Sequence, residues 1–549
     1  MLMTGKEYLQ SIRDGRVIYV GKERVKDQTT HPAFADAART YAALFDMKSD
    51  PAVRELMTFE EGGERYSMYY LQPRSQEDLR RRNRAHRKIA DFCFGLMGRT
   101  PDAFAGNLTG LSLKPEVFDS EPGGSRNNLL AIYQHVRRND LFATYAIVPP
   151  QGARNKDYYL AKGLPQPALR VTAEDDRGVT LNGMKMLASG AVYAHEVLVG
   201  NVMPLAPDQL KESVTCVIPL NLPGLTLWSR EPFNRPGMNP FDRPLTTRFD
   251  ESDCMLVFKD AKVPWEKVIV HDNPALSRNI YIQTAAHVIS NHQSNVRFGS
   301  KLRFMLGVAS LITRFTGARD IPAVRETLGR LAAMEAGYNA MIDGQIEAYQ
   351  PFDNGFVIFN RRYLYAAIHW AMENHSQLID IMRELMGGGQ FQFPASIDVV
   401  EDPELRDLFE TFWTAGEFAA ADRMKLFKLA WDLIGSDHAS RATSYEKFFV
   451  GPAFAVRNYN FINAPWDELH DVNAGHDRRQ TPRANDTMSR LADQRRSLLL
   501  LHFFVNDATG GSRERLRQRN CDRAGSGGRR VILAAAPFDR LRDQQDQPL

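Results

Sequence analysis

The feature that most constrains the fold is the hydrophobic period, which changes twice along the chain. Up to about residue 140, apolar residues recur at the spacing of helices that bury one face. Residues 145–270 instead hold short β-branched segments, such as 197–202 and 214–218, in a stretch broken by prolines. After Pro274 the helical spacing returns and lasts for about 160 residues. This order predicts helices, then a compact antiparallel barrel or sandwich, then a bundle of long antiparallel helices.

We therefore predict an α+β protein in four parts. They are an N-terminal helical domain (residues 1–144), an antiparallel β domain (145–272), a C-terminal helical bundle (273–476) and an irregular tail (477–549). The bundle is expected to hold long helices at about 277–316, 322–349, 357–386 and 403–434. The tail is expected to lie outside the folded core because it has 15 arginines, no lysine and nine acidic residues, with one isolated apolar run.

Composition and charge exclude several classes of protein. The net charge is +3 but the tail alone carries +6, so the weakly acidic remainder gives no reason to expect a nucleic-acid partner. No apolar run approaches the roughly 20 residues needed to span a bilayer, and the N-terminus has no apolar signal segment. We therefore expect a cytoplasmic protein that does not enter a membrane. The four cysteines form no CxxC pair and the 13 histidines show no HxxxH spacing, so we expect neither a disulfide framework nor a metal site.

The stretch 95–102 is the first candidate for a functional site. A helix is predicted to begin after Ser75, which can form a capping box with Asp78, and to end near Gly98. Arg99 then lies just beyond this helix, and we interpret it as the floor of an active site. The alternative is that Arg99 only neutralises the negative end of the helix dipole.

Several short motifs distinguish between families with this layout. No GxGxxG follows a predicted strand, so a Rossmann dinucleotide fold is not expected. The motifs are, in order, TGKEYL (4–9), DGR (14–16), THPAF (30–34), MGRTPD (97–102), AIV (146–148), NGMK (182–185), RFDE (248–251), VPWE (263–266) and KLAWDLIGS (428–436). Through them the chain resembles the oxygenase components of two-component, reduced-flavin-dependent aromatic monooxygenases, the family of 4-hydroxyphenylacetate 3-monooxygenase and chlorophenol monooxygenase.

The resemblance implies an acyl-CoA dehydrogenase-like fold, a homotetramer and hydroxylation of a small phenolic substrate. In such enzymes reduced flavin reacts with O2 to give a C4a-hydroperoxide, whose terminal oxygen is transferred to the ring. The implied cofactors are FAD, bound as FADH2, and O2. A separate NADH:flavin reductase would supply FADH2, because this component would contain no nicotinamide site.

The resemblance also assigns site residues by position. Arg99 matches the family arginine at the substrate and the reactive edge of the flavin, and Thr100, Ala103 and Tyr145 would share in binding the substrate. The residues that match flavin contacts are Tyr145, Ala146, Ile147, Gln151, Gly152, Ala153, Arg154, Ser189, Gly435, Ser436, Ser440 and Arg441.

Two positions depart from the 4-hydroxyphenylacetate enzymes. Ala103 stands where those enzymes have a tyrosine, and Tyr145 stands where they have a histidine. We therefore expect a different phenol, such as a chlorinated or nitrated one.

The expected catalytic residues are Arg99, His292 and Tyr145. The permanent charge of Arg99 suits it to hold the phenolate or the flavin peroxide. His292, at the start of the predicted bundle, is favoured as the base that removes the phenol proton, because a histidine titrates near neutral pH. Tyr145 is a second candidate that would hydrogen-bond the substrate hydroxyl. A purely structural role stays open for His292 and for Tyr145.

Three other functions stay open at this stage. An acyl-CoA dehydrogenase or oxidase would need a catalytic carboxylate in the bundle and a CoA site, and no motif places either. A 4-hydroxybutyryl-CoA dehydratase would need three cysteines for an iron-sulfur cluster, and only Cys93 lies near Arg99 in the sequence. A non-catalytic protein whose basic tail binds nucleic acid would be excluded by a failure to bind DNA.

Overall fold

The computed structural model describes residues 2–474. The chain divides into two units, residues 1–464 and residues 465–549. The described part of the second unit is helix α18 (Trp466–Ala474), and the first unit holds every other described helix and strand. The predicted tail, residues 477–549, lies outside the described residues.

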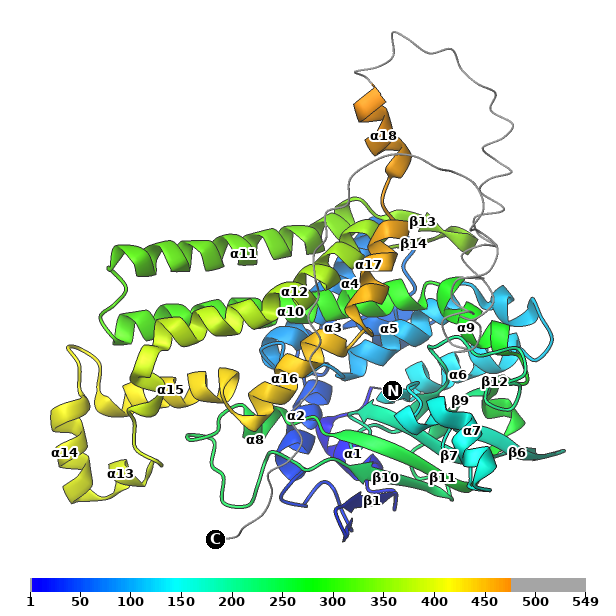
Figure 1. The fold of residues 1–549 in the computed structure, drawn as a ribbon, viewed down its shortest axis with the longest axis horizontal. Helices are drawn as coiled ribbons and strands as arrows, with labels where there is room; N and C mark the ends of the chain where they lie inside the picture. The colour runs from blue at the N-terminus through cyan, green and yellow to red at the C-terminus, as the bar shows by residue number, and fades with distance from the viewer. Residues whose placement is uncertain (1, 475–549) are drawn as a thin grey trace, which may run out of the picture. The chain divides into compact units, whose positions relative to one another are not determined.

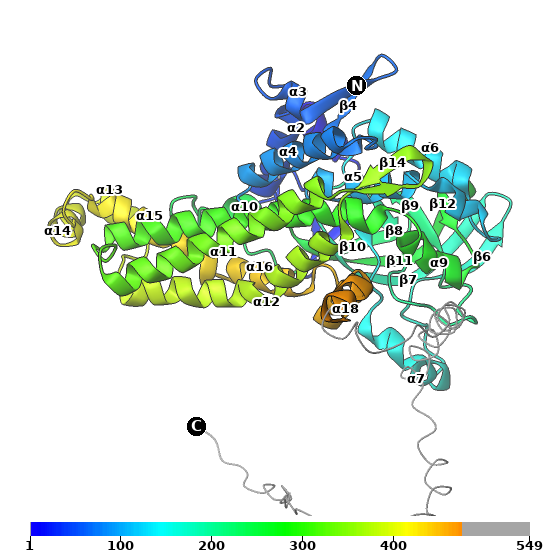
Figure 2. The same cartoon turned by 90° about the horizontal axis from the view of Figure 1, so that it is seen from above.

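The two larger sheets of the first unit lie on one side and its long helices on the other (Figures 1 and 2). The larger sheet has the strand order β2-β1-β10-β11-β7-β6, and the smaller has the order β12-β9-β8-β5. Neighbouring strands are antiparallel except in the β1–β10 and β5–β8 pairs. The strands are β1 (Val17–Val20), β2 (Glu23–Val25), β5 (Ala143–Ala146), β6 (Arg170–Asp175), β7 (Gly178–Ser189), β8 (Glu196–Val199), β9 (Thr215–Pro219), β10 (Leu225–Ser229), β11 (Asp253–Pro264) and β12 (Val268–Val270).

The helices of the first unit, with these sheets, confirm the predicted α+β class. They are α1 (Gly5–Ser11), α2 (Ala35–Asp46), α3 (Arg54–Met57), α4 (Gln76–Phe92), α5 (Pro101–Ser112), α6 (Arg126–Arg138), α7 (Lys156–Ala161), α8 (Thr246–Phe249), α9 (Pro274–Ile282), α10 (Ala286–Phe315), α11 (Pro322–Glu347), α12 (Arg361–Met386), α13 (Asp398–Glu401), α14 (Pro403–Trp413), α15 (Ala420–Ile434), α16 (Asp437–Phe448) and α17 (Ala453–Ile462). No described helix is both long enough and apolar enough to cross a bilayer. The division of the first unit at residues 144 and 272 stays a prediction.

The N-terminal part is not purely helical, so that prediction is wrong for four short strands. β1 pairs in parallel with β10, where Val17 lies opposite Thr226. β3 (Thr58–Glu61) and β4 (Glu64–Ser67) form a separate hairpin. β1 reads Val-Ile-Tyr-Val, and such β-branched and aromatic residues fit a pleated surface. Local periodicity missed β1 because the strand that completes it lies far downstream in the chain.

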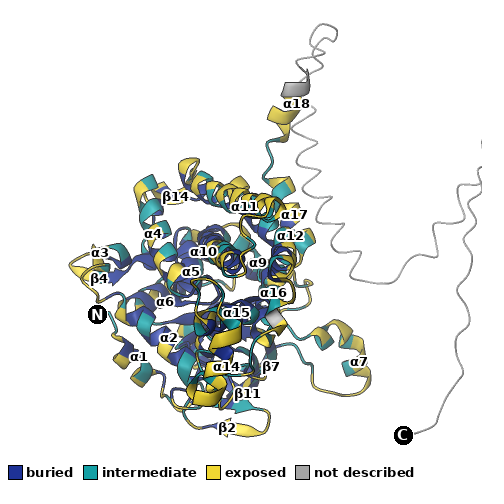
Figure 3. Cartoon of the chain, turned by 90° about the vertical axis from the view of Figure 1, so that its left-hand side faces the viewer, coloured by how far each residue is buried: buried dark blue, intermediate teal, exposed yellow. Residues whose placement is uncertain are grey.

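Helix α10 is the centre of the bundle. It packs against α4, α5, α11 and α12, and most of its residues are buried. α11 has few buried residues and is exposed over much of its length (Figure 3). The long helices α11 and α12 confirm two of the predicted helices, whereas the first, at 277–316, is divided into α9 and α10. The fourth, at 403–434, is divided into α14 and α15, and Gly416 in the break has a φ of 59°. A hairpin that was not predicted, β13 (Gln350–Phe352) with β14 (Phe356–Ile358), connects α11 to α12.

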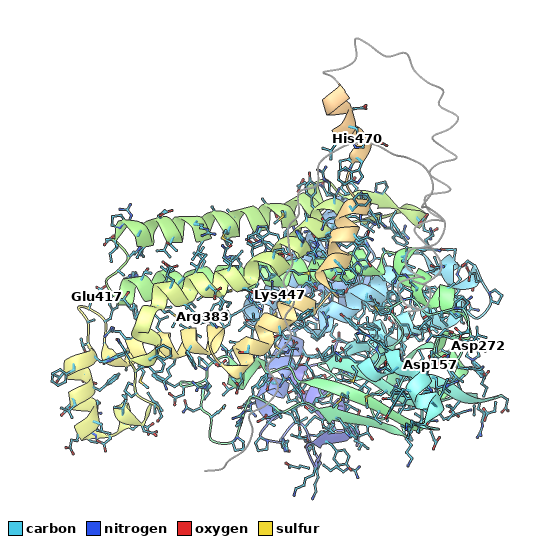
Figure 4. The ribbon with its side chains drawn as sticks, viewed as in Figure 1. Asp157, Asp272, Arg383, Glu417, Lys447 and His470 are labelled. Carbon is cyan, nitrogen blue, oxygen red and sulfur yellow. The ribbon has the colours of Figure 1, made fainter. Side chains whose placement is uncertain are left out.

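Long basic side chains fix α15 and α16 against α12. The guanidinium of Arg383 donates to the carbonyl of Ile434 at the end of α15, over 3.1 Å. The ammonium of Lys447 on α16 donates to the carbonyl of Met372 on α12, over 2.6 Å. Both side chains are labelled in Figure 4. Helix α16 is therefore held on the bundle and projects toward the sheets.

The turn between α4 and α5 is shaped by its contact with α10. The predicted capping box of Ser75 with Asp78 is confirmed at the start of α4. The helix ends earlier than predicted, because Phe94 and Gly95 take φ values of 52° and 65°. A Cβ on Gly95 would lie 2.2 Å from the carbonyl oxygen of Arg297 on α10, so only glycine fits there. The Arg297 side chain donates to the carbonyl of Gly95 over 2.8 Å, which holds the turn in place.

A lysine is fully buried inside the β region. The ammonium of Lys185 on β7 donates to the carbonyl of Gly200 over 2.7 Å and to the side-chain oxygen of Asn201 over 2.8 Å. No carboxylate among the described residues pairs with it. Burial lowers the pKa of Lys185 to about 7, from an ordinary value of 10.5.

This pKa makes stability depend on pH in the alkaline range. Between pH 7 and 10.5 the folded protein loses the Lys185 proton while the unfolded chain keeps it, so the free energy of unfolding rises with pH. We expect the wild type to gain up to ~1.4 kcal/mol per pH unit more than Lys185→Met across this window. Urea unfolding at several pH values measures the slope of the free energy of unfolding against pH for each protein. Lys259→Met, which changes an exposed lysine of β11, is the control, and equal slopes in all three proteins would contradict the assignment.

Candidate active site

Arg99 lies in the turn between α4 and α5, with only 9% of its surface exposed. The central carbon of its guanidinium is 4.7 Å from the ring centroid of Tyr145 on β5 and 5.4 Å from that of Tyr445 on α16. It donates one hydrogen bond, of 3.2 Å, to the carbonyl of Phe449. Among the described residues, no carboxylate forms an ion pair with this guanidinium. Arg99 is therefore a buried positive charge between two aromatic rings, without a counter-ion.

Tyr445 reaches this site across the surface of Gly98. A Cβ on Gly98 would lie 2.2 Å from Cζ and 2.3 Å from Oη of Tyr445. A side chain at position 98 would displace the end of the Tyr445 ring, so the glycine permits this close approach. The sequence interpretation missed Tyr445, and the only local sign of it was the glycine beside Arg99.

Arg441 connects α16 to the sheet and to the Arg99 turn. Its guanidinium donates to Glu251 over 2.6 Å, to the two oxygens of Asp253 over 2.7 and 3.0 Å, and to the hydroxyl of Ser189 over 3.4 Å. The other oxygen of Glu251 accepts the backbone N–H of Arg99 over 2.9 Å. Burial alone would raise the pKa of the Asp253 carboxyl, but the guanidiniums of Arg441 and Arg230 hold it well below its usual range. Arg441 thus fixes the backbone of Arg99 through Glu251.

The charges around the site are nearly balanced. Arg230 binds Asp250 and Asp253, and Glu446 binds Arg297 and Lys301. In the described part of this cluster, the cations are Arg99, Arg230, Arg297, Lys301 and Arg441, and the carboxylates are Asp250, Glu251, Asp253 and Glu446. The cation left without a carboxylate is Arg99, so the site is suited to an anionic ligand.

The other residues assigned to the substrate lie at the start of α5. Thr100 donates to Asp102 over 2.5 Å and accepts from the side-chain amide of Gln293 over 3.3 Å. The backbone carbonyl of Ala103 accepts from the hydroxyl of Ser290 over 3.2 Å. The structure thus places Arg99 and Tyr145 in contact, with Thr100 and Ala103 buried in the first turn of α5 next to them.

The segment assigned to the flavin lies along β7. After Ala146 and Ile147, the backbone of Val148 pairs with Met186 over 2.8 Å, and residues 151–155 form a 3-10 turn. Leu187, next to Met186, has a φ of 59° and is 62% exposed, although bulky residues seldom adopt this conformation. The register of β7 against β11 shifts at this point, so the strand is bulged just before Ser189. The exposed side chains of Val148 and Leu187 give an apolar surface beside a hydroxyl and a guanidinium, which fits a flat, polar-edged ring.

The remaining residues assigned to the flavin differ in their exposure and in their contacts. Gln151 and Arg154 are exposed and Gly152 and Ala153 are half-buried, all in the 3-10 turn. The Ser436 hydroxyl accepts the Ala439 N–H over 3.1 Å and so caps α16. Gly435 lies against the indole of Trp431, and Ser440 is exposed. Of the α16 segment, Arg441 is the residue that hydrogen-bonds Ser189.

His292 does not lie beside Arg99, and we withdraw it as the base. Its Nδ1 is 2.8 Å from the side-chain oxygen of Gln345, and its Nε2 is 3.1 Å from that of Asn83. The ring stacks on Phe359 at a centroid distance of 3.5 Å. Burial holds the pKa of its imidazole well below the ordinary value, so the ring is neutral and can donate to only one of these two amide oxygens. The side chain that reaches Thr100 belongs instead to Gln293, the next residue along the helix.

Known proteins resemble this chain over most of its length. Residues 4–270 match the model for the 4-hydroxyphenylacetate 3-hydroxylase N terminal region, and residues 277–473 match the model for the C terminal region of the same enzyme. The 4-hydroxyphenylacetate 3-monooxygenase oxygenase component of Thermus thermophilus is 32% identical over 466 residues, which cover 84% of this chain and 94% of that protein. The 4-nitrophenol 2-monooxygenase oxygenase component of a Rhodococcus species is 28% identical over 462 residues, 83% of this chain and 87% of that protein.

Solved structures agree with these matches. The crystal structure of HpaB, the oxygenase component of 4-hydroxyphenylacetate 3-monooxygenase, complexed with FAD and 4-hydroxyphenylacetate superimposes with a TM-score of 0.80. It is 29% identical and covers 86% of this chain and 99% of its own. A 4-hydroxybutyryl-CoA dehydratase from N. maritimus has a TM-score of 0.77 at 16% identity, covering 89% of this chain and 99% of its own, and so shares the fold.

The role of Arg441 can be tested through stability. Arg441→Met leaves Glu251 and Asp253 buried without their main counter-ion, and we expect the free energy of unfolding to fall by ~3–5 kcal/mol. Arg457→Met is the matched control, because the side chain of Arg457 on α17 is 56% exposed and its ion-pair partner in the described part of the chain is the half-exposed Glu373. Its effect should stay within about 0.5 kcal/mol. Urea unfolding followed by circular dichroism measures both. Equal effects of the two changes would contradict the central role of Arg441.

Proposed function

Because the chain belongs to the 4-hydroxyphenylacetate 3-hydroxylase family, we propose that it is the oxygenase component of a two-component monooxygenase that uses FADH2 and O2 to hydroxylate a phenol. The observation that carries the proposal is the guanidinium of Arg99, which is buried between Tyr145 and Tyr445 and has no carboxylate partner within residues 2–474. A phenolate is an aromatic anion, so it matches both the charge and the rings of this site.

Arg99 would stabilise the ionised form of the substrate. An arginine stays charged at any physiological pH, and the N-terminal end of α5 adds positive potential at the same point. Both lower the free energy of a phenolate relative to its phenol, and ionisation makes the ring more nucleophilic. Tyr145 would hydrogen-bond the substrate oxygen, and Thr100 and Ala103 would line the site.

The residues that would hold FAD are those that the family resemblance assigns to the flavin. They are Tyr145, Ala146, Ile147, Gln151, Gly152, Ala153, Arg154, Ser189, Gly435, Ser436, Ser440 and Arg441. The apolar surface of Val148 and Leu187 would lie against the ring system, with Ser189 and Arg441 at its polar edge. When bound, reduced FAD would activate O2 and so supply the oxygen atom that enters the substrate. The protein would orient the two ring systems and exclude water between them.

The substrate is proposed to be a phenol other than 4-hydroxyphenylacetate. Ala103 leaves less side chain at the start of α5 than the tyrosine of the 4-hydroxyphenylacetate enzymes, and Tyr145 replaces a histidine. The Rhodococcus relative is named for its action on 4-nitrophenol, which makes substituted phenols the first compounds to test.

Two partners complete the proposal. A separate NADH:flavin reductase would deliver FADH2. Further copies of the chain would form a homotetramer, which would cover exposed apolar side chains such as Leu405, Leu408 and Phe412 on α14.

The proposal is tested by mixing the anaerobic protein and FADH2 with oxygenated buffer and a panel of phenols. We expect at least one phenol to give a hydroxylated product, with less hydrogen peroxide than in its absence. Arg99→Met should lower kcat/KM for that phenol on the order of 100-fold, whereas Arg99→Lys, which keeps the charge, should lose less. Arg457→Met is the control for an exposed arginine. Flavin oxidation at the rate of free FADH2, with peroxide as the only product for every phenol, would overturn the proposal in favour of an acyl-CoA-type flavoenzyme.

A further inference from the structure

The hydroxyl of Tyr445 has no hydrogen-bond partner among the described residues, although its oxygen is buried. The ring itself is well packed. It stacks on Phe449 with ring centroids 5.5 Å apart and planes at 14°, and it lies on the backbone of Gly98. A phenylalanine would make the same packing contacts without burying a polar atom. The unpartnered hydroxyl therefore needs a function that packing does not explain.

The surroundings of this hydroxyl are strongly cationic. The central guanidinium carbons of Arg441, Arg297 and Arg99 lie 4.9, 5.2 and 5.4 Å from the Tyr445 ring centroid. Arg441 and Arg297 are neutralised by Glu251, Asp253 and Glu446, whereas Arg99 is not. The remaining attraction of the site is therefore for a negatively charged oxygen close to Arg99.

Tyr445 can meet such an oxygen as a donor. The charged and titratable groups that face it are Arg99, Arg297, Arg441, Glu251 and Tyr145. Burial raises the pKa of the Tyr445 hydroxyl above its ordinary value, against the opposing effect of Arg99 and Arg297, so the proton stays on the oxygen at neutral pH. A neutral O–H beside an uncompensated guanidinium offers two donors of different kinds to one anionic acceptor.

We propose that Tyr445 is a substrate-binding residue whose hydroxyl donates a hydrogen bond to the phenolate oxygen that Arg99 neutralises. This inference rests on the proposed function and assigns to α16 a direct contact with the substrate. Gly98 then also contributes to the substrate site, because it lets Tyr445 approach the Arg99 turn closely enough to place its hydroxyl there.

The test uses 4-nitrophenol, whose ionised form is coloured, titrated into the full-length protein at several pH values. Tyr445→Phe removes one oxygen and keeps the ring, so we expect it to weaken binding of the nitrophenolate about tenfold or more. The pH at which half of the bound ligand is ionised should rise in the variant. Tyr133→Phe is the matched control, because Tyr133 is a buried tyrosine whose hydroxyl donates to the carbonyl of Tyr70 over 2.6 Å, away from this site. Tyr133→Phe should change neither the affinity for nitrophenolate nor the pH at which half of the bound ligand is ionised.

A second variant, Gly98→Ala, keeps the hydroxyl but pushes it out of place, and should weaken nitrophenolate binding in the same direction. FAD binding, measured by its fluorescence, is recorded for every protein. Equal nitrophenolate binding by wild type and Tyr445→Phe, with Arg99→Met impaired, would overturn this inference and leave the proposed function in place. Loss of FAD binding without loss of nitrophenolate binding in Tyr445→Phe would also overturn it, because the hydroxyl would then contact the cofactor. A wild type that binds neither nitrophenolate nor any other phenolate of the panel would count against the proposed function itself.

Discussion

Arg441 joins three parts of the chain that are far apart in the sequence: Ser189 at the end of β7, Asp253 at the start of β11, and its own helix α16. Its planar guanidinium can serve Glu251 and Asp253 at once, which a lysine could not do in the same geometry. Glu251 also accepts a hydrogen bond from the backbone N–H of Arg99. Arg441 therefore positions the turn that holds Arg99 through Glu251, and the guanidinium of Arg99 takes no part in this contact. Each of these charges is stable in the interior only while its partners are present.

A second buried ion cluster also fixes the position of α16, next to Tyr445. Arg297 and Lys301 on α10 converge on Glu446, the residue after Tyr445. Helix α16 is therefore held by ion pairs at Arg441 and at Glu446, and Tyr445 lies between these two residues in the sequence. Of the five cations named above for this cluster, Arg99 is the one with no carboxylate partner among the described residues, so a buried positive charge is left for a ligand. That arrangement is consistent with a site for an aromatic anion and requires the rest of the cluster to be rigid.

Candidate site residues could be proposed from the sequence where they lie in or next to a short motif. They could not be identified where only the phase of a long helix decides which side chain faces the site. Arg99, Tyr145 and Ser189 lie in or beside turns and strand ends, where one or two residues determine the local conformation. His292 lies in a run of five buried polar residues on a long helix, residues 291–295, so the sequence does not say which of them faces the turn at Thr100. Tyr445 was missed for a related reason. Nothing within α16 distinguishes a tyrosine that reaches a distant glycine from one that packs in the bundle.

The sequence by itself determined the elements that depend on neighbours along the chain: the capping box at Ser75, the strand-like period of β7 to β11, and the long helices α11 and α12. It did not determine β1, whose parallel partner is β10, or the break that divides α14 from α15. The tertiary structure alone decided which charges are paired, which glycines are needed for close approach, and which polar atom is left without a partner. Those properties depend on distances between residues hundreds of positions apart, and such distances are set by packing and burial in three dimensions, which local periodicity and capping do not encode.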